Sequence, residues 1–252
     1  MRQVFASAVA VLALGAGTAS AAEVTLIAPG GIRAAIEELI PKFQQQSGNT
    51  VKATFGSGGG TKARVIKGEP FDVPVVQLPL EPVLNSGNVV SASETPLAHV
   101  SVGVAVRAGQ PKPDISTADK VKKLLLDAKS IAYPNPAGGA AAGVSFDQTM
   151  QKLGITDEMK PKIKLAQGGR GAMEMLAKGD VDIGLTFVSE IITEPGVEAV
   201  GPLPRDISTP TVLVGFASTH AKDPAATKAL LAFLSGPTAA AVYKERGMEP
   251  GR

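Results

Sequence analysis

A glycine-rich segment in the first third of the chain carries the clearest sign of chemistry. Residues 53–68 (ATFGSGGGTKARVIKG) read as a strand end, a glycine run that includes Ser57 and Gly58, and a short helix. Glycines let a backbone approach a ligand closely. The N–H groups that open a helix have no internal partners and lie at the positive end of its dipole. The segment is therefore a candidate anion site, and the alternative is a tight turn without a ligand.

Two familiar phosphate-binding motifs do not fit this segment. A P-loop ends in Gly-Lys-Ser/Thr, whereas Thr61 precedes Lys62 here and Ala63 follows it. A G-x-G-x-x-G pattern also fails, because Ala63 occupies the position of the third glycine. We interpret Lys62 and Arg64 as solvated charges on the short helix.

Other segments rich in small residues also follow predicted strands and lead into helices. They are 28–31, 134–143 and 167–171. Because ligands of open α/β sheets bind at the carboxyl ends of the strands, we expect these segments to converge with 56–60 on one anion. The predicted ligand-binding residues are Gly30, Gly31, Ser57, Gly58, Ala137, Gly138, Gly139, Gly169, Arg170 and Phe187.

Arg170 is the one charge within the glycine frame of 167–171. A guanidinium can hold a carboxylate through two hydrogen bonds, so we predict that Arg170 binds the ligand if the ligand is a carboxylate. The alternative is a solvated arginine near a helix N-terminus, where a positive charge is unfavourable.

Composition argues against several other kinds of site. The chain has no cysteine and only two histidines, His99 and His220, neither of which has a companion at metal-ligand spacing. We therefore predict no metal and no cofactor. The formal net charge of +2 is too small for a nucleic-acid footprint. Tryptophan is absent and tyrosine scarce, which disfavours a sugar cleft.

The elements that must position these segments form two alternating series. Strands at 23–28, 51–55 and 72–77 alternate with helices at 32–46, 61–67 and 78–84. A strand at 99–107 leads to a second series, with strands at 130–133, 162–166 and 181–187 and helices at 117–126, 144–153 and 172–178. Strands at 198–201 and 211–217 and helices at 224–234 and 236–246 follow. Alternation of this kind predicts sheets flanked by helices.

The N-terminus has the parts of a secretory signal peptide. Arg2 precedes an apolar run from Val4 to Leu14, and Ala19-Ser20-Ala21 fits a cleavage site. We expect cleavage after about Ala21 and an exported protein in the periplasm. An exported chain without disulfides depends on its core for stability.

Taken together, this chain resembles a periplasmic solute-binding protein of an ABC importer, of the molybdate-binding-like branch. The resemblance covers nearly the whole mature chain. Its matching segments are 24–48 (VTLIAPGGIRAAIEELIPKFQQQSG), 55–73 (FGSGGGTKARVIKGEPFDV), 175–187 (MLAKGDVDIGLTF) and 229–250 (ALLAFLSGPTAAAVYKERGMEP).

The resemblance implies an α/β, two-lobed periplasmic-binding-protein-like fold. Each lobe is a mixed, mostly parallel sheet flanked by helices, and the ligand cleft lies between the lobes. We expect a signal peptide at 1–21, a first lobe at 22–98 plus about 200–252, and a second lobe at about 99–199. Closure is expected to be a hinge motion near 99–107 and 195–215. The expected partners are a small anionic ligand and an ABC permease. We expect no nucleic acid as a partner, and we expect the protein to be a monomer.

The chain departs from the family pattern at some positions, so the resemblance does not fix the identity of the anion. Molybdate binders of this kind usually have a serine where this chain has Gly30-Gly31, and a tyrosine where it has Phe187. The ligand is thus a molybdate-like oxyanion or a di- or tricarboxylate. An alternative is an isomerase resembling aconitate isomerase. General acid–base work needs a group within reach, and the glycine segments contain no His, Cys or Glu. The nearest candidates, Ser57, Tyr133 and Ser145, read better as capping or packing residues, so we assign no catalytic residue.

Overall fold

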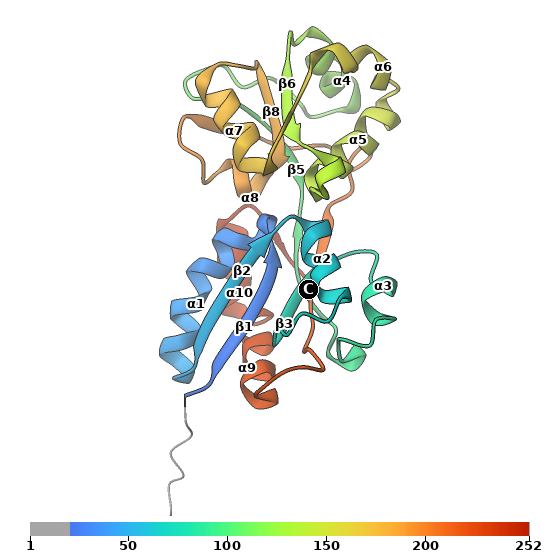
Figure 1. The fold of residues 1–252 in the computed structure, drawn as a ribbon. Coiled ribbons are helices and arrows are strands. Elements are labelled where there is room, and N and C mark those ends of the chain that lie inside the picture. Colours follow the sequence, from blue (N-terminus) through green and yellow to red (C-terminus); the bar gives the residue numbers. More distant parts are fainter. Residues whose placement is uncertain (1–20, 252) are drawn as a thin grey trace, which may run out of the picture.

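The computed structural model describes residues 21–251, arranged as two lobes that lie one above the other in Figure 1. The predicted signal peptide falls mostly on residues 1–20, outside the described residues. Each lobe contains one β-sheet with helices packed against it. The predicted two-lobed α/β fold is confirmed.

The first lobe is built around a six-stranded sheet with the order β11-β4-β10-β3-β1-β2. Its strands are β1 (Glu23–Pro29), β2 (Thr50–Gly56), β3 (Val73–Gln77), β4 (Thr95–Val100), β10 (Thr211–Gly215) and β11 (Glu249–Pro250). Its helices are α1 (Arg33–Ser47), α2 (Gly58–Ile66), α3 (Glu81–Leu84), α9 (Pro224–Leu234) and α10 (Pro237–Glu245), with short 3-10 turns η1 (Gly30–Ile32) and η2 (Ser91–Ser93).

The second lobe is built around a five-stranded sheet with the order β7-β6-β8-β5-β9. Its strands are β5 (Val102–Arg107), β6 (Ile131–Pro134), β7 (Ile163–Ala166), β8 (Ile183–Phe187) and β9 (Val197–Pro202). Its helices are α4 (Ala118–Asp127), α5 (Ala141–Leu153), α6 (Thr156–Met159), α7 (Gly168–Lys178) and α8 (Val188–Ile191), with 3-10 turns η3 (Pro136–Gly138) and η4 (Lys160–Lys162).

The two sheets repeat one arrangement. Three parallel strands lie together in each, β3-β1-β2 in the first lobe and β8-β6-β7 in the second. An antiparallel strand borders each trio, β10 beside β3 and β5 beside β8. The carboxyl ends of the parallel strands in both lobes therefore carry the loops that lead to helices.

The predicted strand at 99–107 is in fact two strands. β4 ends at Val100 in the first sheet and β5 begins at Val102 in the second, so the chain crosses between lobes at Ser101. It returns between β9 and β10. Both strands bury apolar side chains, so the apolar pattern continues across Ser101. The sequence pattern therefore does not show where β4 ends and β5 begins.

Amphipathic patterning explains why α1 forms where it does. Ile36, Leu39 and Phe43 are buried on one face, at the i, i+3 and i+4 spacing of a helix. Gly48 ends the helix in the left-handed conformation with φ of 74°. Pro41 lies inside the helix. The helix packs against α10 and α9, which belong to the end of the chain.

Within residues 21–251, no single helix is long and apolar enough to cross a membrane. The helices α9 and α10 reach that length and apolar character only together, as a pair bent by 50°.

Asp72 is buried just before β3, and its hydrogen bonds connect segments of the first lobe that are far apart in the sequence. Its Oδ2 accepts hydrogen bonds from the Thr25 N–H at 2.7 Å and the Thr25 hydroxyl at 2.6 Å. Its Oδ1 accepts one from the Lys222 N–H at 2.7 Å. Burial alone would raise the pKa of Asp72, but the hydrogen bonds from Thr25 and Lys222 lower it below the usual value of 3.8.

We predict that Asp72→Ala lowers the free energy of unfolding by about 2–4 kcal/mol, because it leaves buried N–H groups unpaired. The measurement is urea unfolding at neutral pH. Asp157→Ala, which removes an 86% exposed side chain, is the control and should change stability by less than about 0.5 kcal/mol. Equal effects of the two substitutions would contradict the assignment.

The same hydrogen bonds make the contribution of Asp72 to the free energy of unfolding depend on pH. Because the pKa of Asp72 is lowered on folding, its contribution is fully present above the unfolded value near 3.8 and is lost as pH falls through the folded pKa. The stability difference between wild type and Asp72→Asn should therefore shrink on acidification.

Candidate ligand-binding site

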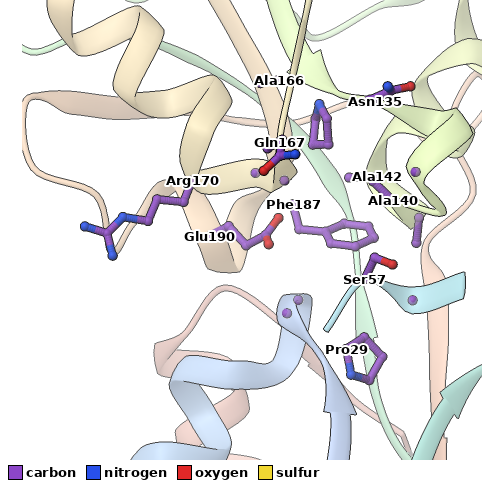
Figure 2. Close-up of a pocket in the computed structure, with 18 of the residues that line it drawn as sticks. Pro29, Ser57, Asn135, Ala140, Ala142, Ala166, Gln167, Arg170, Phe187 and Glu190 are labelled. Carbon is purple, nitrogen blue, oxygen red and sulfur yellow. The ribbon is translucent and has the colours of Figure 1, made fainter. Parts of the chain in front are cut away.

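A cavity of about 440 Å³ lies between the two lobes. The first lobe contributes the segments that follow β1 and β2, and the second lobe contributes those that follow β6, β7 and β8 (Figure 2). The lining residues are Pro29–Gly31, Gly56–Gly58, Pro134, Asn135, Gly138, Ala140–Ala142, Ala166–Arg170, Phe187 and Glu190. The predicted convergence of the four small-residue segments is thus present.

Helix N-termini surround this cavity. α2 begins at Gly58, α5 at Ala141 and α7 at Gly168, and each of these residues lines the cavity. The turn η1 also begins there, at Gly30, and leads into α1. First-turn N–H groups have no intrahelical acceptors, and the positive ends of the dipoles point to the same space. The cavity is therefore suited to negative charge.

Three of these helices begin earlier than predicted, and α5 is one of them, since it begins at Ala141 where residue 144 was expected. The glycines at 58–60 form the first turn of α2, where a loop was expected, and α7 begins at Gly168 where Ala172 was expected. Glycine has a low helix propensity, which is why the sequence pattern indicated loops. Ser57 caps α2, because its Oγ accepts a hydrogen bond from the Gly60 N–H at 3.1 Å.

The two lobes touch each other beside the cavity. The Gly59 N–H donates to the Gly139 carbonyl at 2.9 Å. The Ser189 hydroxyl donates to the Gly31 carbonyl at 2.7 Å. A Cβ on Gly31 would lie 2.7 Å from Cδ2 of the Phe187 ring, so only glycine permits this approach. Small residues thus let backbone from opposite lobes come into direct contact.

The structure brings most of the predicted ligand-binding residues to the cavity wall: Gly30, Gly31, Ser57, Gly58, Gly138, Gly169, Arg170 and Phe187. Ala137 and Gly139 are not among the lining residues. The Ala137 N–H already donates to Asn135 Oδ1 at 3.0 Å, and Gly139 adopts a φ of 76° and accepts from Gly59. That any of these residues contacts a ligand stays a prediction.

The side chain of Arg170 points away from the cavity in Figure 2. It is 77% exposed, and its Nε lies 3.0 Å from Glu174 Oε1 and 3.7 Å from Glu194 Oε1. Glu174 follows Arg170 by four residues, the spacing that favours an ion pair along a helix. In this structure the residue contributes its backbone to the site, and its guanidinium does not reach the predicted position.

Glu190 is the site residue that the sequence pattern did not reveal. It lies in α8, a short helix after β8 that was not predicted, and its carboxyl points to the cavity (Figure 2). Its Oε2 accepts a hydrogen bond from the Thr186 hydroxyl at 2.5 Å. The signal available in the sequence was an acidic residue just past the carboxyl end of a parallel strand, where sites of α/β sheets form.

Desolvation raises the pKa of Glu190, and the nearby Glu194 raises it further. Hydrogen bonds from the Thr186 hydroxyl and the Phe187 N–H act in the opposite direction, and the balance is a raised pKa. The cavity therefore contains a carboxyl group that holds a proton more readily than an exposed one.

Of the earlier candidates for proton transfer, Ser57 lines the cavity and caps α2, whereas Tyr133 and Ser145 do not reach the cavity. Tyr133 is buried, and its hydroxyl donates to Asp147 Oδ1 at 2.7 Å. Tyr133 and Ser145 are both absent from the lining residues. Within residues 21–251, no three His, Asp or Glu side chains are grouped as a metal site would require.

Comparison with known proteins agrees with this architecture. The profile of the family described as "Bacterial extracellular solute-binding protein" matches residues 24–249. The chain therefore belongs to the bacterial extracellular solute-binding protein family, the substrate-binding proteins of ABC importers, and the resemblance to its molybdate-binding-like branch is confirmed.

Individual relatives carry two kinds of name. Aconitate isomerase from a Pseudomonas species is 29% identical over 232 residues, which cover 90% of this chain and 87% of that protein. Molybdate-binding protein ModA from Azotobacter vinelandii is 28% identical over 246 residues, which cover 94% and 95%. The solved periplasmic molybdate-binding protein of A. vinelandii superposes with a TM-score of 0.76 at 23% identity, covering 91% of this chain and all of that one.

We predict that Gly59→Ala shifts the protein toward a more open arrangement, because the new Cβ would lie 3.0 Å from the Gly139 Cα of the other lobe. Small-angle X-ray scattering should then give a larger radius of gyration. Gly171→Ala is the matched control, since its Cβ would make an ordinary 3.6 Å contact with Ala166. Identical scattering from both variants would show that the Gly59–Gly139 contact does not hold the lobes together.

Proposed function

We propose that this protein is the periplasmic, monomeric binding component of an ABC importer, and that it captures a small organic anion, a di- or tricarboxylate, between its lobes for delivery to a membrane permease. The observation that carries the proposal is the convergence of the α2, α5 and α7 N-termini on one cavity. The signal-peptide pattern of residues 1–21 supports export.

The size and walls of the cavity favour an organic anion over a bare oxyanion. A volume of about 440 Å³ is within the range of sites for small organic molecules. One tetrahedral oxyanion fills only a small part of that space. The Phe187 ring and the methyl groups of Ala140 and Ala142 also line it (Figure 2), and these apolar surfaces suit a carbon skeleton.

The charge of the site supports an anion held by neutral donors. Among the described residues, Arg170 is the only cationic residue that lines the cavity, and its side chain is paired with Glu174 outside it. Backbone N–H groups at helix N-termini then supply the attraction, as in other anion sites of this kind.

A panel of anions tested by thermal shift should distinguish the ligand classes. We predict that trans-aconitate or citrate raises the midpoint of unfolding more than molybdate, sulfate or phosphate. At a ligand concentration of 100 times Kd the stabilisation is about 2.7 kcal/mol. A shift with molybdate alone would overturn the carboxylate assignment, and no shift with any anion would overturn anion binding.

Matched variants make the same experiment specific to the site. Gly169→Ala should abolish the shift, because its Cβ would lie 2.3 Å from Glu190 Oε2 and 2.4 Å from Thr186 Oγ1. Gly171→Ala, two residues further along α7 and outside the cavity wall, should retain it.

Glu190 gives the isomerase alternative its specific support. Moving a double bond within an unsaturated carboxylate requires a base that removes a proton from one carbon and returns it to another. A cavity-facing carboxyl with a raised pKa is suited to that task. The relative named aconitate isomerase makes trans-aconitate the natural test compound.

Prolonged incubation of purified protein with trans-aconitate separates the two functions. The importer function predicts an unchanged ultraviolet spectrum, because the ligand is bound and released intact. A spectral change that Glu190→Gln removes and Glu194→Gln retains would instead establish the isomerase. Glu194 is the suitable control because it borders the neighbouring groove and does not line the cavity.

A further inference from the structure

Glu190 places an acidic side chain in a cavity whose helix N-termini favour anions. Among the described residues that line the cavity, it is the only one with an acidic side chain. Its carboxyl lies against the backbone of both lobes: a Cβ on Gly30 would be 3.3 Å from Oε1, and a Cβ on Gly169 would be 2.3 Å from Oε2. These two glycines make room for the carboxyl, and Figure 2 shows it directed to the cavity.

The two oxygens of Glu190 have different surroundings. Oε2 accepts the Thr186 hydroxyl at 2.5 Å, deep in the second lobe, where Thr186 is fully buried. Oε1 lies toward Gly30, at the start of η1 in the first lobe. Thr186 therefore fixes Oε2 as an acceptor, and Oε1 is the oxygen that faces the first lobe.

The cationic side chains near Glu190 already have carboxylate partners. A second cavity of about 740 Å³ borders Glu190 on the side of α1 and α8 and contains three arginines. Arg33 pairs with Glu37 at 2.9 Å, and Arg246 pairs with Glu38 at 2.8 Å. Arg170 pairs with Glu174 and lies near Glu194.

These arginines therefore give Glu190 no counter-ion of its own. The charge that acts on it most directly is Glu194, which is negative. An ionised Glu190 would face a bound anion across the cavity, and two like charges at close range disfavour each other. The combination is stable only if one of them is neutralised, and a shared proton does this while adding a hydrogen bond.

We propose that Glu190 is the proton-coupled group of the site: it carries a proton when the anion is bound and donates that proton in a hydrogen bond to the guest. This inference rests on the proposed anion-binding function. When Glu190 is ionised in the empty protein, binding of a fully ionised anion takes up one proton from solvent. Anion capture is then tighter at lower pH.

The electrostatic surroundings act in the same direction. Desolvation and Glu194 already raise the pKa of Glu190 in the empty site, against the opposing hydrogen bonds from Thr186 and the Phe187 N–H. A guest anion adds a further negative charge and raises the pKa again.

A purely structural role for Glu190 makes a different prediction. Glu190 is the third residue of α8, and its hydrogen bond with the N–H of the N-cap Phe187 is the arrangement of a capping box. A carboxylate that serves only as a cap remains ionised, and anion binding then involves no proton.

Isothermal titration calorimetry in buffers of different ionisation enthalpy decides between these roles. The probes are trans-aconitate and molybdate, both fully ionised at neutral and alkaline pH. We expect wild type to take up one proton per anion at alkaline pH, with Kd rising about tenfold per pH unit. Glu190→Gln should bind with no proton uptake and a Kd independent of pH. Glu194→Gln, the neighbouring carboxylate, should retain proton uptake.

The outcomes separate the two proposals. Anion binding by wild type without proton uptake would overturn the role of Glu190 and leave the binding function intact. Proton uptake that persists in Glu190→Gln would assign the proton to another group. Failure of wild type to bind either probe or any anion of the thermal-shift panel would overturn both proposals. Even if Glu190→Gln does not fold, the absence of proton uptake by wild type would still overturn the role of Glu190.

Discussion

The structure depends on bringing helix N-termini from two separate sheets to one small space. Each terminus offers a modest stabilisation to a nearby anion, about 0.3–1 kcal/mol when exposed and up to about 2 kcal/mol when partly buried. In the proposed function, several of them together supply the attraction, because Arg170, the only cationic residue among the described lining residues, directs its side chain away from the cavity. The proposed anion binding would account for the many glycines and alanines at the strand ends, because larger side chains there would keep the N–H groups away from a bound anion.

The segments that line the cavity could be predicted from the sequence, but the direction of the Arg170 side chain and the presence of Glu190 could not. The segments at 28–31, 56–60, 134–143 and 167–171 could be predicted because small residues followed recognisable strands, and parallel strands share one carboxyl edge. The direction of the Arg170 side chain could not, because it depends on competition between the cavity and Glu174, one helical turn away.

Glu190 was hidden for a different reason. The pattern of β8 ends at Phe187, and the helix that follows has only four residues, too few to show a periodicity. Ser101 was hidden because β4 and β5 are both buried and read as one strand. In both cases the missing information is long-range packing, which a single chain pattern does not contain. The partly buried Glu190 carboxyl also bears on both candidate functions: it would have to be ionised to act as a base, whereas the proposed proton-coupled binding needs it protonated.

The crossing at Ser101 has a consequence for how the chain assembles. The second lobe is an uninterrupted stretch placed between β4 and β10, which are neighbours in the first sheet. During synthesis, all five strands of the second sheet have been made before β10 emerges from the ribosome. The first sheet must wait for its inner strand β10 and its edge strand β11, both of which follow residue 210. The inserted lobe is therefore the one positioned to fold first, and a chain that stops early leaves the other lobe with an open β-edge.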